Sequence, residues 1–116
     1  MKKKIICFDL DNVLCETINS NYTKSTPLKK NINVVNHLYN KGYYIKIFTA
    51  RYMGRSKENA IKAKQQAQTL TKKQLKKWQV NYNQLIFGKP SFDVYIDDKN
   101  YNFDKSWASK LKKELL

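Results

Sequence analysis

The sequence alternates short apolar runs with longer amphipathic or polar stretches. Four apolar runs predict strands, at 4–10, 43–49, 85–87 and 92–96. Their near-continuous apolar character is typical of strands buried in a parallel sheet. Helical spacing predicts the other elements, which are a helix over about 26–41, two helices within about 56–81, and a last helix over about 103–116.

Local signals mark where these helices begin and end. Thr26 is expected to cap the first helix with Pro27 at its first position, and Gly42 to end it. Thr71 is expected to cap the second helix of the stretch 56–81. The polar, turn-prone segment 12–25 is expected to be a loop.

This order of elements indicates one α/β domain over residues 1–116. We expect a three-layer, Rossmann-like parallel sheet with helices on both faces. No linker, repeat or low-complexity tail divides the chain, and its length suits a single hydrophobic core.

Composition narrows the class of protein. No apolar run approaches the roughly 20 residues that span a bilayer, so no membrane partner is expected. Cys7 and Cys15 give neither a zinc pattern nor a disulfide framework, which favours a reduced, cytoplasmic setting.

The formal charge of +14 is less informative than its size suggests. Nearly all the basic residues are lysines, with Arg51 and Arg55 the only arginines, whereas nucleic-acid binders usually recruit arginine. A solvated lysine-rich surface and attraction of anionic substrates both remain compatible with this charge.

Two pairs of carboxylates stand at the ends of predicted strands. Asp9 and Asp11 end the first strand, and Asp97 and Asp98 follow the fourth. The carboxyl ends of parallel strands meet at one edge of the sheet, where ligands bind. Carboxylates gathered there need a cation, and Mg²⁺ prefers oxygen ligands, so Asp9, Asp11, Asp97 and Asp98 are the predicted metal site.

Other residues at the strand ends extend this constellation. Thr49 ends the second strand and Lys89 follows the third, where both suit the binding of an anionic oxygen. The remaining candidate carboxylates, Asp93 and Asp104, are expected to have structural roles.

These residues, taken in order, resemble the four motifs of the haloacid dehalogenase (HAD) superfamily. Residues 8–13 (FDLDNV) resemble the first motif, 47–49 (IFT) the second, 88–90 (GKP) the third and 94–98 (VYIDD) the fourth. In the first motif, Asn12 stands where glycine is commoner and Val13 where threonine is commoner. Asn tolerates the left-handed backbone that the glycine position needs.

The resemblance implies a Mg²⁺-dependent phosphatase. Asp9 would attack phosphorus to form an aspartyl-phosphate, and Asp11 would act as general acid and then general base. Thr49 and Lys89 would hold the phosphoryl oxygens. Asp97 would be a metal ligand, with Asp98 binding directly or through water.

The intervals between motifs are too short for the cap domain found in many family members. Such members either accept large substrates or cover the site with a neighbouring subunit, so a homo-oligomer is one expectation. Residues 48–55 and the block 74–99 also resemble short HAD-type proteins associated with bacterial capsule and surface-polysaccharide biosynthesis. The implied substrate is a small sugar or polyol phosphate.

Several alternatives remain open. Arg51 could contact the substrate through its planar fork, or could be a surface arginine that pairs with Glu58. Trp78 and Tyr82 are expected to dock a helix onto the sheet, although they could stack on bases. The alternative functions are a nucleotide or polynucleotide-end phosphatase and, from another class, a non-catalytic nucleic-acid-binding protein.

Overall fold

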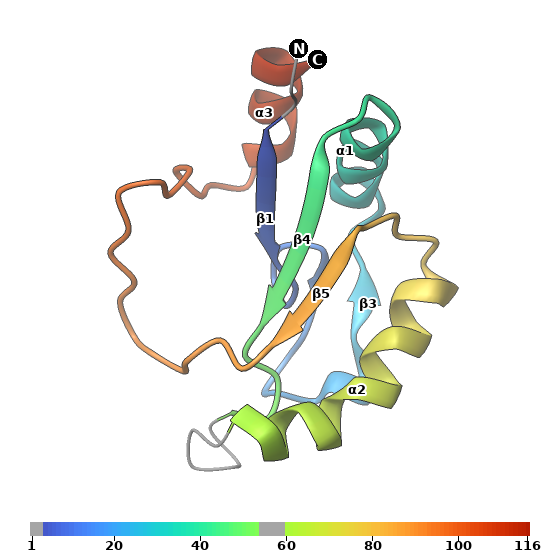
Figure 1. Cartoon of the computed structure of the whole chain (residues 1–116), viewed down its shortest axis with the longest axis vertical. Helices are drawn as coiled ribbons and strands as arrows, with labels where there is room; N and C mark the ends of the chain where they lie inside the picture. The colour runs from blue at the N-terminus through green and yellow to red at the C-terminus, as the bar shows by residue number, and fades with distance from the viewer. Residues whose placement is uncertain (1–3, 54–59) are drawn as a thin grey trace.

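The computed structural model describes residues 4–53 and 60–116 and shows an α/β fold around a three-stranded parallel sheet (Figure 1). The strand order is β1 (Ile5–Asp9), β4 (Tyr44–Thr49) and β5 (Gln84–Phe87). Phe8 is in register with Ile47, and Thr49 with Phe87, so all three strands end near one edge of the sheet. The parallel α/β prediction is confirmed.

One face of the sheet carries the core. Phe8, Ile45 and Ile47 are buried on it, and the three helices contribute residues to the same apolar cluster. Those helices are α1 (Lys29–Asn40), α2 (Ala60–Lys77) and α3 (Trp107–Leu115). Trp78 and Tyr82 pack against this cluster, as expected of residues that dock a helix.

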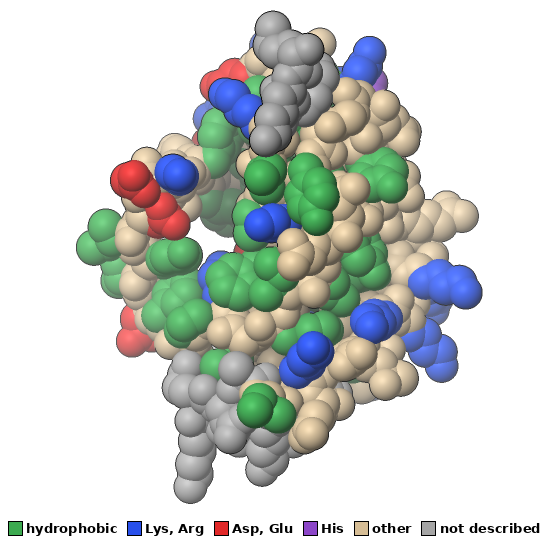
Figure 2. Space-filling model, in the orientation of Figure 1, with side chains coloured by type: hydrophobic (Ala, Val, Ile, Leu, Met, Phe, Trp, Pro, Cys, Tyr) green, Lys and Arg blue, Asp and Glu red, His purple; other side chains and the backbone are tan. Residues whose placement is uncertain are grey.

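The opposite face is not covered by a helix in the described part of the chain. Ile5 is 59% and Tyr44 is 41% exposed there, and Figure 2 shows apolar side chains on this side of the molecule. The expected helices on both faces are therefore not what these residues show. Apolar content alone suggested burial on two sides, but alternate residues of β1 and β4 face solvent.

The first helix begins later than the sequence signals indicated. Thr26 and Pro27 form the short strand β3, which pairs antiparallel with β2 (Cys15–Glu16), and Leu28 precedes α1. The predicted loop 12–25 therefore holds β2 and the 3₁₀ turn η1 (Tyr22–Lys24). The prediction that Pro27 occupies the first helical position was wrong, because Thr26 and Pro27 pair with β2 instead. Gly42, at φ 95°, follows the helix as predicted.

The lysine- and glutamine-rich stretch forms one helix, α2, where two were expected; its first expected residues, 56–59, lie outside the described residues. Thr71 was predicted to cap a second helix, but it lies inside α2 and is fully buried. The Thr71 hydroxyl, which was expected to cap a helix, instead accepts a hydrogen bond from the distant Arg51.

Residues 92–96 do not form the predicted fourth strand. Segment 88–104 bows away from β1 (Figure 1), and Val94 and Ile96 are 77% and 91% exposed. The rings of Phe92 and Tyr95 lie 4.9 Å apart, a contact between positions i and i+3 that an extended strand would place on opposite faces. Local contacts therefore replace the expected ladder.

The last helix is shorter than predicted. It begins at Trp107, after Ser106, whose backbone N–H and hydroxyl both donate to Asp104, each at 2.8 Å. The structural role expected for Asp104 is confirmed. None of the helices in the described ranges has the length and apolar character needed to cross a bilayer.

Candidate active site

The chain turns sharply after β1 and places two carboxylates at the edge of the sheet. Asp9 is the last residue of the strand, and the carbonyl of Leu10 accepts backbone hydrogen bonds from Val13, Leu14 and Cys15. Asn12 adopts the left-handed conformation (φ 65°) expected from the sequence. This turn presents Asp9 and Asp11 on the same side.

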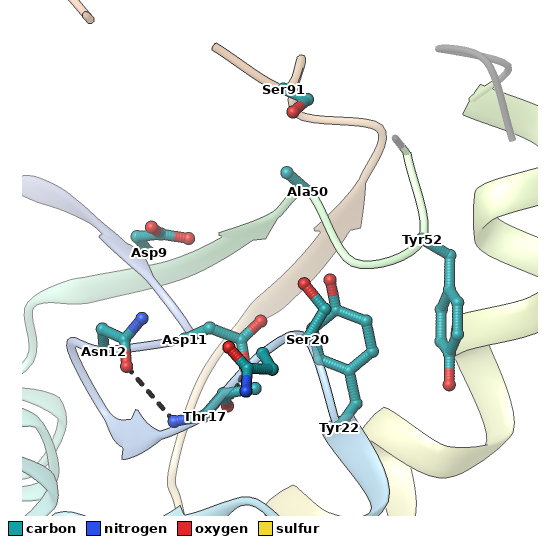
Figure 3. A pocket seen from close by; sticks show the side chains of 10 residues that line it. Asp9, Asp11, Asn12, Thr17, Ser20, Tyr22, Ala50, Tyr52 and Ser91 are labelled. Carbon is teal, nitrogen blue, oxygen red and sulfur yellow. Dashed lines mark hydrogen bonds between the residues drawn. The ribbon is translucent and has the colours of Figure 1, made fainter. Parts of the chain in front are cut away.

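Both carboxylates line a cavity of about 480 Å³ (Figure 3). Neutral polar side chains form most of the remaining wall, together with Ala50. These side chains are Asn12, Thr17, Asn19, Ser20, Tyr22, Tyr52 and Ser91. The cavity is large enough to hold a small organic molecule together with a phosphoryl group.

Asp9 is partly exposed and has two electrostatic partners. The backbone N–H of Leu10 donates to its Oδ1 at 2.8 Å, and Lys89 Nζ lies 3.6 Å from its Oδ2. Burial raises the pKa of Asp9, while Lys89 and the Leu10 N–H oppose that rise. The ammonium group thus favours the ionised carboxylate that a nucleophile requires.

Lys89 is held beside Asp9 by the backbone and by two rings. Its N–H donates to the carbonyl of Thr49 at 3.1 Å, which continues the pairing of β4 with β5. Its ammonium lies 5.4 Å from the ring centre of Phe92 and 5.2 Å from that of Tyr95. These contacts direct the charge toward the end of β1.

Thr49 lies at the end of β4, as predicted, but its side chain is fully buried. Its hydroxyl oxygen accepts a hydrogen bond from the backbone N–H of Arg51 at 3.1 Å. Thr49 and Lys89 are thus brought together, although neither is among the residues that line the cavity.

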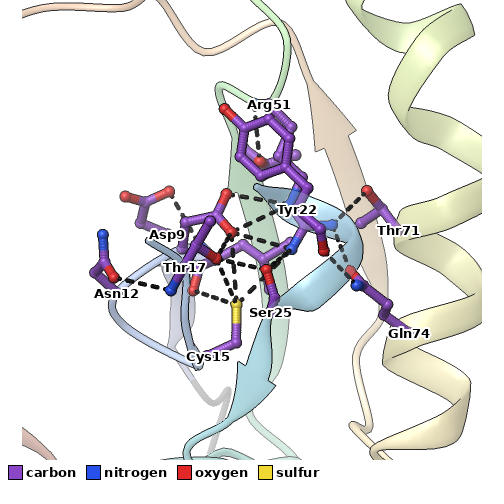
Figure 4. A network of polar contacts seen from close by, with 12 residues as sticks. Asp9, Asn12, Cys15, Thr17, Tyr22, Ser25, Arg51, Thr71 and Gln74 are labelled. Atoms are coloured by element: carbon purple, nitrogen blue, oxygen red, sulfur yellow. Dashed lines mark hydrogen bonds and ion pairs between the residues drawn. The ribbon is translucent and has the colours of Figure 1, made fainter. Parts of the chain in front are cut away.

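A buried arginine holds Asp11 (Figure 4). Nε of Arg51 lies 3.2 Å from Oδ1 and 3.1 Å from Oδ2 of Asp11, and NH2 lies 3.0 Å from Oδ1. From α2, Thr71 and Gln74 accept hydrogen bonds from NH1 at 3.2 and 2.6 Å. Thr17 also donates to Asp11 Oδ1, at 2.6 Å.

This placement differs from both sequence-based readings of Arg51. Its side chain is fully buried, so it is not a surface arginine, and Glu58, its suggested partner, lies outside the described residues. Its planar fork binds Asp11, which does not match the predicted direct substrate contact. Arg51 positions a carboxylate of the site.

Cys15 is packed beneath this network. Its thiol is buried, lies 3.5 Å from Asp11 Oδ1, and has its pKa raised to about 11, chiefly by burial. A thiol with so high a pKa is poorly nucleophilic near neutral pH. Cys15 belongs to the apolar core cluster and packs there as a small hydrophobic residue.

Asp97 and Asp98 do not join the other carboxylates in this structure. Both are exposed on the segment that bows away from β1, where Asp97 accepts hydrogen bonds from the Tyr95 hydroxyl and the Lys99 backbone N–H. The described residues contain no group of three or more Asp, Glu, His or Cys side chains close enough to share a metal ion. Of the four carboxylates in the predicted metal site, Asp9 and Asp11 lie together here.

Sequence reasoning missed the residues that complete the site from loops and from α2. Tyr22 and Tyr52 line the cavity, and Gln74 links Arg51 to the carbonyl of Tyr22. The only local signal was the position of Tyr52, just past the strand-end Thr49. Nothing in the pattern of α2 distinguished Gln74 from its other glutamines.

Comparison with known proteins identifies structural relatives. No protein-family model matches the chain, and no curated protein sequence matches it. A Vibrio cholerae protein of known crystal structure is 26% identical, with a TM-score of 0.78 over 97% of this chain and 98% of that one. Its likeness covers essentially both chains.

Two further matches are chains of Pnkp1/Rnl/Hen1 complexes, one described as an RNA repair complex. Each is 18% identical and covers 97% of this chain, with TM-scores of 0.56 and 0.54. This chain spans only 34% and 32% of their lengths. At this identity the likeness concerns the fold alone.

Proposed function

We propose that the chain is a HAD-type phosphomonoester hydrolase that forms an aspartyl-phosphate on Asp9. The observation that carries this proposal is the arrangement of two carboxylates on one cavity, with Lys89 Nζ 3.6 Å from Asp9. The order of the four sequence motifs supports the same assignment. In this proposal the domain is a small, capless member of the family.

The two carboxylates divide the chemistry. An oxygen of Asp9 forms a bond to phosphorus while the bond to the leaving oxygen breaks, and Asp11 supplies the proton that this oxygen needs. Water then attacks the phosphorus and gives its proton to Asp11, while the bond between phosphorus and the Asp9 oxygen breaks. Inorganic phosphate leaves, and the Asp9 carboxylate is restored. Lys89 stabilises negative charge on the transferred group, while buried Thr49 holds the backbone of Lys89 through its carbonyl.

The hydrogen bonds of Asp11 distinguish its two carboxylate oxygens. Oδ1 receives Thr17 and two nitrogens of Arg51, whereas Oδ2 receives only Arg51 Nε among the described residues. Oδ2 therefore retains capacity for a further partner and is the oxygen we assign to proton transfer. Arg51 fixes the plane of the carboxylate and does not itself contact the reacting atoms.

The proposed cofactor is Mg²⁺, which would neutralise charge between Asp9 and the phosphate. Two carboxylates on one polar cavity fit a hard cation, and Asp9 is accessible there. The proposed ligand set is Asp9, Asp11 through its backbone carbonyl, and Asp97, with Asp98 binding directly or through water.

For Asp97 to join this set, segment 91–98 would have to lie along the free edge of β1. Two observations support such a rearrangement. In the described part of the chain β1 pairs only with β4, and Tyr95 already contacts Lys89 at the site. Docking would also cover the exposed Val94 and Ile96.

Amide hydrogen exchange with and without Mg²⁺ tests this rearrangement. We expect the amides of 92–97 to gain protection when Mg²⁺ is added, and Asp97→Asn to abolish that gain. Equal exchange in both conditions, in a preparation with Mg²⁺-dependent activity, would show that the segment does not supply the ligands.

The proposed substrate is a small sugar or polyol phosphate used in capsule or surface-polysaccharide biosynthesis. The second candidate, a polynucleotide-end phosphatase, is favoured by the likeness to chains of an RNA repair complex. A non-catalytic nucleic-acid-binding role predicts salt-sensitive RNA binding that persists in Asp9→Asn.

A phosphatase screen with sugar phosphates, polyol phosphates, nucleotides and 5′- or 3′-phosphorylated RNA separates these candidates. We expect Mg²⁺-dependent release of phosphate that Asp9→Asn eliminates and that Glu114→Gln, at an exposed position of α3, retains. Rapid acid quenching should trap a hydroxylamine-sensitive phosphoenzyme. Equal turnover by Asp9→Asn and the wild type would refute the nucleophile.

A further inference from the structure

The short hairpin of β2 and β3 brings two hydroxyl groups against the carboxylate of Asp11. In this hairpin Glu16 lies opposite Thr26. Continuing the register by one residue places Thr17 opposite Ser25, and their hydroxyl oxygens lie 2.6 Å apart. Residues directly opposite one another in an antiparallel pair hold their side chains close together, which allows this contact. The unexpected strand β3 therefore has a consequence at the cavity.

The two hydroxyls close a ring of hydrogen bonds with the buried ion pair (Figure 4). Thr17 Oγ1 donates to Asp11 Oδ1 at 2.6 Å. Arg51 NH2 donates to the same oxygen at 3.0 Å and to Ser25 Oγ at 3.4 Å. Arg51 is fully buried and the other three members of the ring are partly buried. The ring thus joins the hairpin to the loop that follows β4.

The chemistry of the four groups fixes the direction of each bond in the ring. An ionised carboxylate only accepts and a guanidinium only donates, whereas a hydroxyl has one proton to give. Thr17 gives its proton to Asp11, so the short contact between the two hydroxyls must use the proton of Ser25. Ser25 in turn accepts from Arg51. The donors therefore run in one direction, from the guanidinium to Asp11 Oδ1, and each bond polarises the next.

The backbone of Thr17 is fixed independently of the ring. Its N–H donates to Asn12 Oδ1 at 3.2 Å, a bond that Figure 3 shows. Asn12, at φ 65°, belongs to the sharp turn that presents Asp11. Thr17 is therefore held to this turn by its backbone and to Asp11 by its side chain, so a rotation of the carboxylate would break the bond to Oδ1.

We propose that Thr17 and Ser25 are positioning residues that hold the Asp11 carboxylate with Oδ2 available for proton transfer. This inference rests on the proposed phosphatase function, and neither residue belongs to the four motifs. Nε of Arg51 contacts both oxygens of Asp11, whereas Thr17 contacts Oδ1. Without the Thr17 bond the carboxylate pivots against the guanidinium, and its free oxygen is less often aimed at the reacting atoms.

Thr17→Val removes the hydroxyl while keeping the branched shape of the side chain. We expect kcat for the best phosphomonoester to fall about 10–30-fold and KM to stay within about twofold, because a misplaced group slows the reaction more than it weakens binding. Thr17→Ser restores the hydroxyl and should recover kcat to within about threefold of wild type. Ser25→Ala should lower kcat about three- to tenfold, and adding it to Thr17→Val should cause no further loss, because the hydroxyls act in series.

Thr23→Val is the matched control, because the exposed Thr23 hydroxyl donates to Asn21 outside this ring. Its kcat and KM should equal those of wild type. A rise in KM with unchanged kcat in Thr17→Val would indicate a direct substrate contact and overturn the inference. Multiplicative losses in the double variant, or failure of Thr17→Ser to recover kcat, would also overturn it.

A second measurement examines the ring without the reaction. Exchange of the Arg51 Nε–H with solvent, followed by NMR, reports how firmly the guanidinium and the Asp11 carboxylate are held together. We expect Thr17→Val to accelerate this exchange about fivefold or more, and Thr17→Ser and Thr23→Val to leave it within about twofold of wild type. If the wild type hydrolyses no phosphoester, the phosphatase proposal fails. Equal exchange in wild type and Thr17→Val would instead refute the positioning role itself.

Discussion

Arg51 and Asp11, forty residues apart in the chain, form a two-sided ion pair at the base of the cavity. Nε and NH2 of Arg51 lie 3.0–3.2 Å from the Asp11 carboxylate, and the Arg51 side chain is fully buried. A bidentate contact fixes both the position and the plane of a carboxylate, which a single ammonium cannot do. The orientation of the proposed general acid therefore depends on a buried residue that is not among those lining the cavity.

Replacing Arg51 with lysine should distinguish the effect of its positive charge from the effect of its bidentate geometry on Asp11. Lysine keeps the positive charge but loses the fork, so we expect kcat to fall roughly 10²-fold, while KM changes little. Steady-state kinetics with the best phosphomonoester measures both quantities. A large rise in KM with unchanged kcat would instead indicate a direct substrate contact.

Removing the guanidinium altogether should destabilise the fold. Arg51→Ala leaves Asp11 without its buried partner, and such a loss costs about 3–5 kcal/mol of unfolding free energy. Urea unfolding followed by circular dichroism measures this cost. A change below 1 kcal/mol would show that the pair contributes little to stability.

Thr71 gives a finer test of the same network. Thr71→Val removes the hydroxyl that accepts from Arg51 NH1 while nearly conserving volume, and we expect a loss of about 1–3 kcal/mol. Thr69→Val, at an exposed position of α2, is the matched control and should stay within about 0.5 kcal/mol. Equal effects of the two substitutions would argue for a change in helix propensity instead.

Thr71 also shows where sequence reasoning stops. Threonine favours helix starts, so the prediction divided α2 there, but the partner that uses its hydroxyl comes from a loop twenty residues earlier. Pro27 was assigned to a helix for a similar reason, because the local sequence pattern does not reveal its pairing with Cys15. Periodicity located the three strands of the sheet and placed Asp9, Asp11, Thr49 and Lys89 at one edge of it. It did not anticipate the contacts of Phe92, Tyr95 and Asp97 with their own neighbours.

Lys89 should act on Asp9 and on the phosphate together. Lys89→Gln removes a cation 3.6 Å from the nucleophile, and we expect kcat/KM to fall about 10²–10³-fold. Since Lys89 lowers the pKa of Asp9, the acidic limb of the pH–rate profile should also move to higher pH. Lys112→Gln, at an exposed position of α3, should change neither quantity.

Asp104 gives a pH-dependent test of stability. Hydrogen bonds from Lys110 and Ser106 hold its pKa at about 2, below the ordinary 3.8. Its contribution to stability is therefore fully present above pH 3.8 and is lost as the pH falls toward 2. Asp104→Asn should be less stable than wild type at pH 6 and closer to it near pH 2, as measured by urea unfolding. A constant difference across this pH range would contradict the prediction.

The two cysteines should react at very different rates. Cys7 is exposed, whereas Cys15 is buried with its pKa raised to about 11. In the folded protein at pH 8 we expect one fast thiol with Ellman's reagent, and both thiols after unfolding in urea. Cys7→Ser should show no fast thiol. Two fast thiols in the folded wild type would mean that the core beneath Asp11 opens readily.

While the outer edge of β1 is open, it offers any extended chain a row of backbone donors and acceptors, which is how sheet proteins begin to polymerise. A net charge of +14 makes two copies repel before such edges can meet. That repulsion reaches only about 8 Å at physiological ionic strength, and multivalent anions shorten it further. The lysines, although uninformative about the reaction, thus keep molecules apart by electrostatic repulsion. Polyanions or concentrated salt should weaken this repulsion and allow the open edges to associate into fibres.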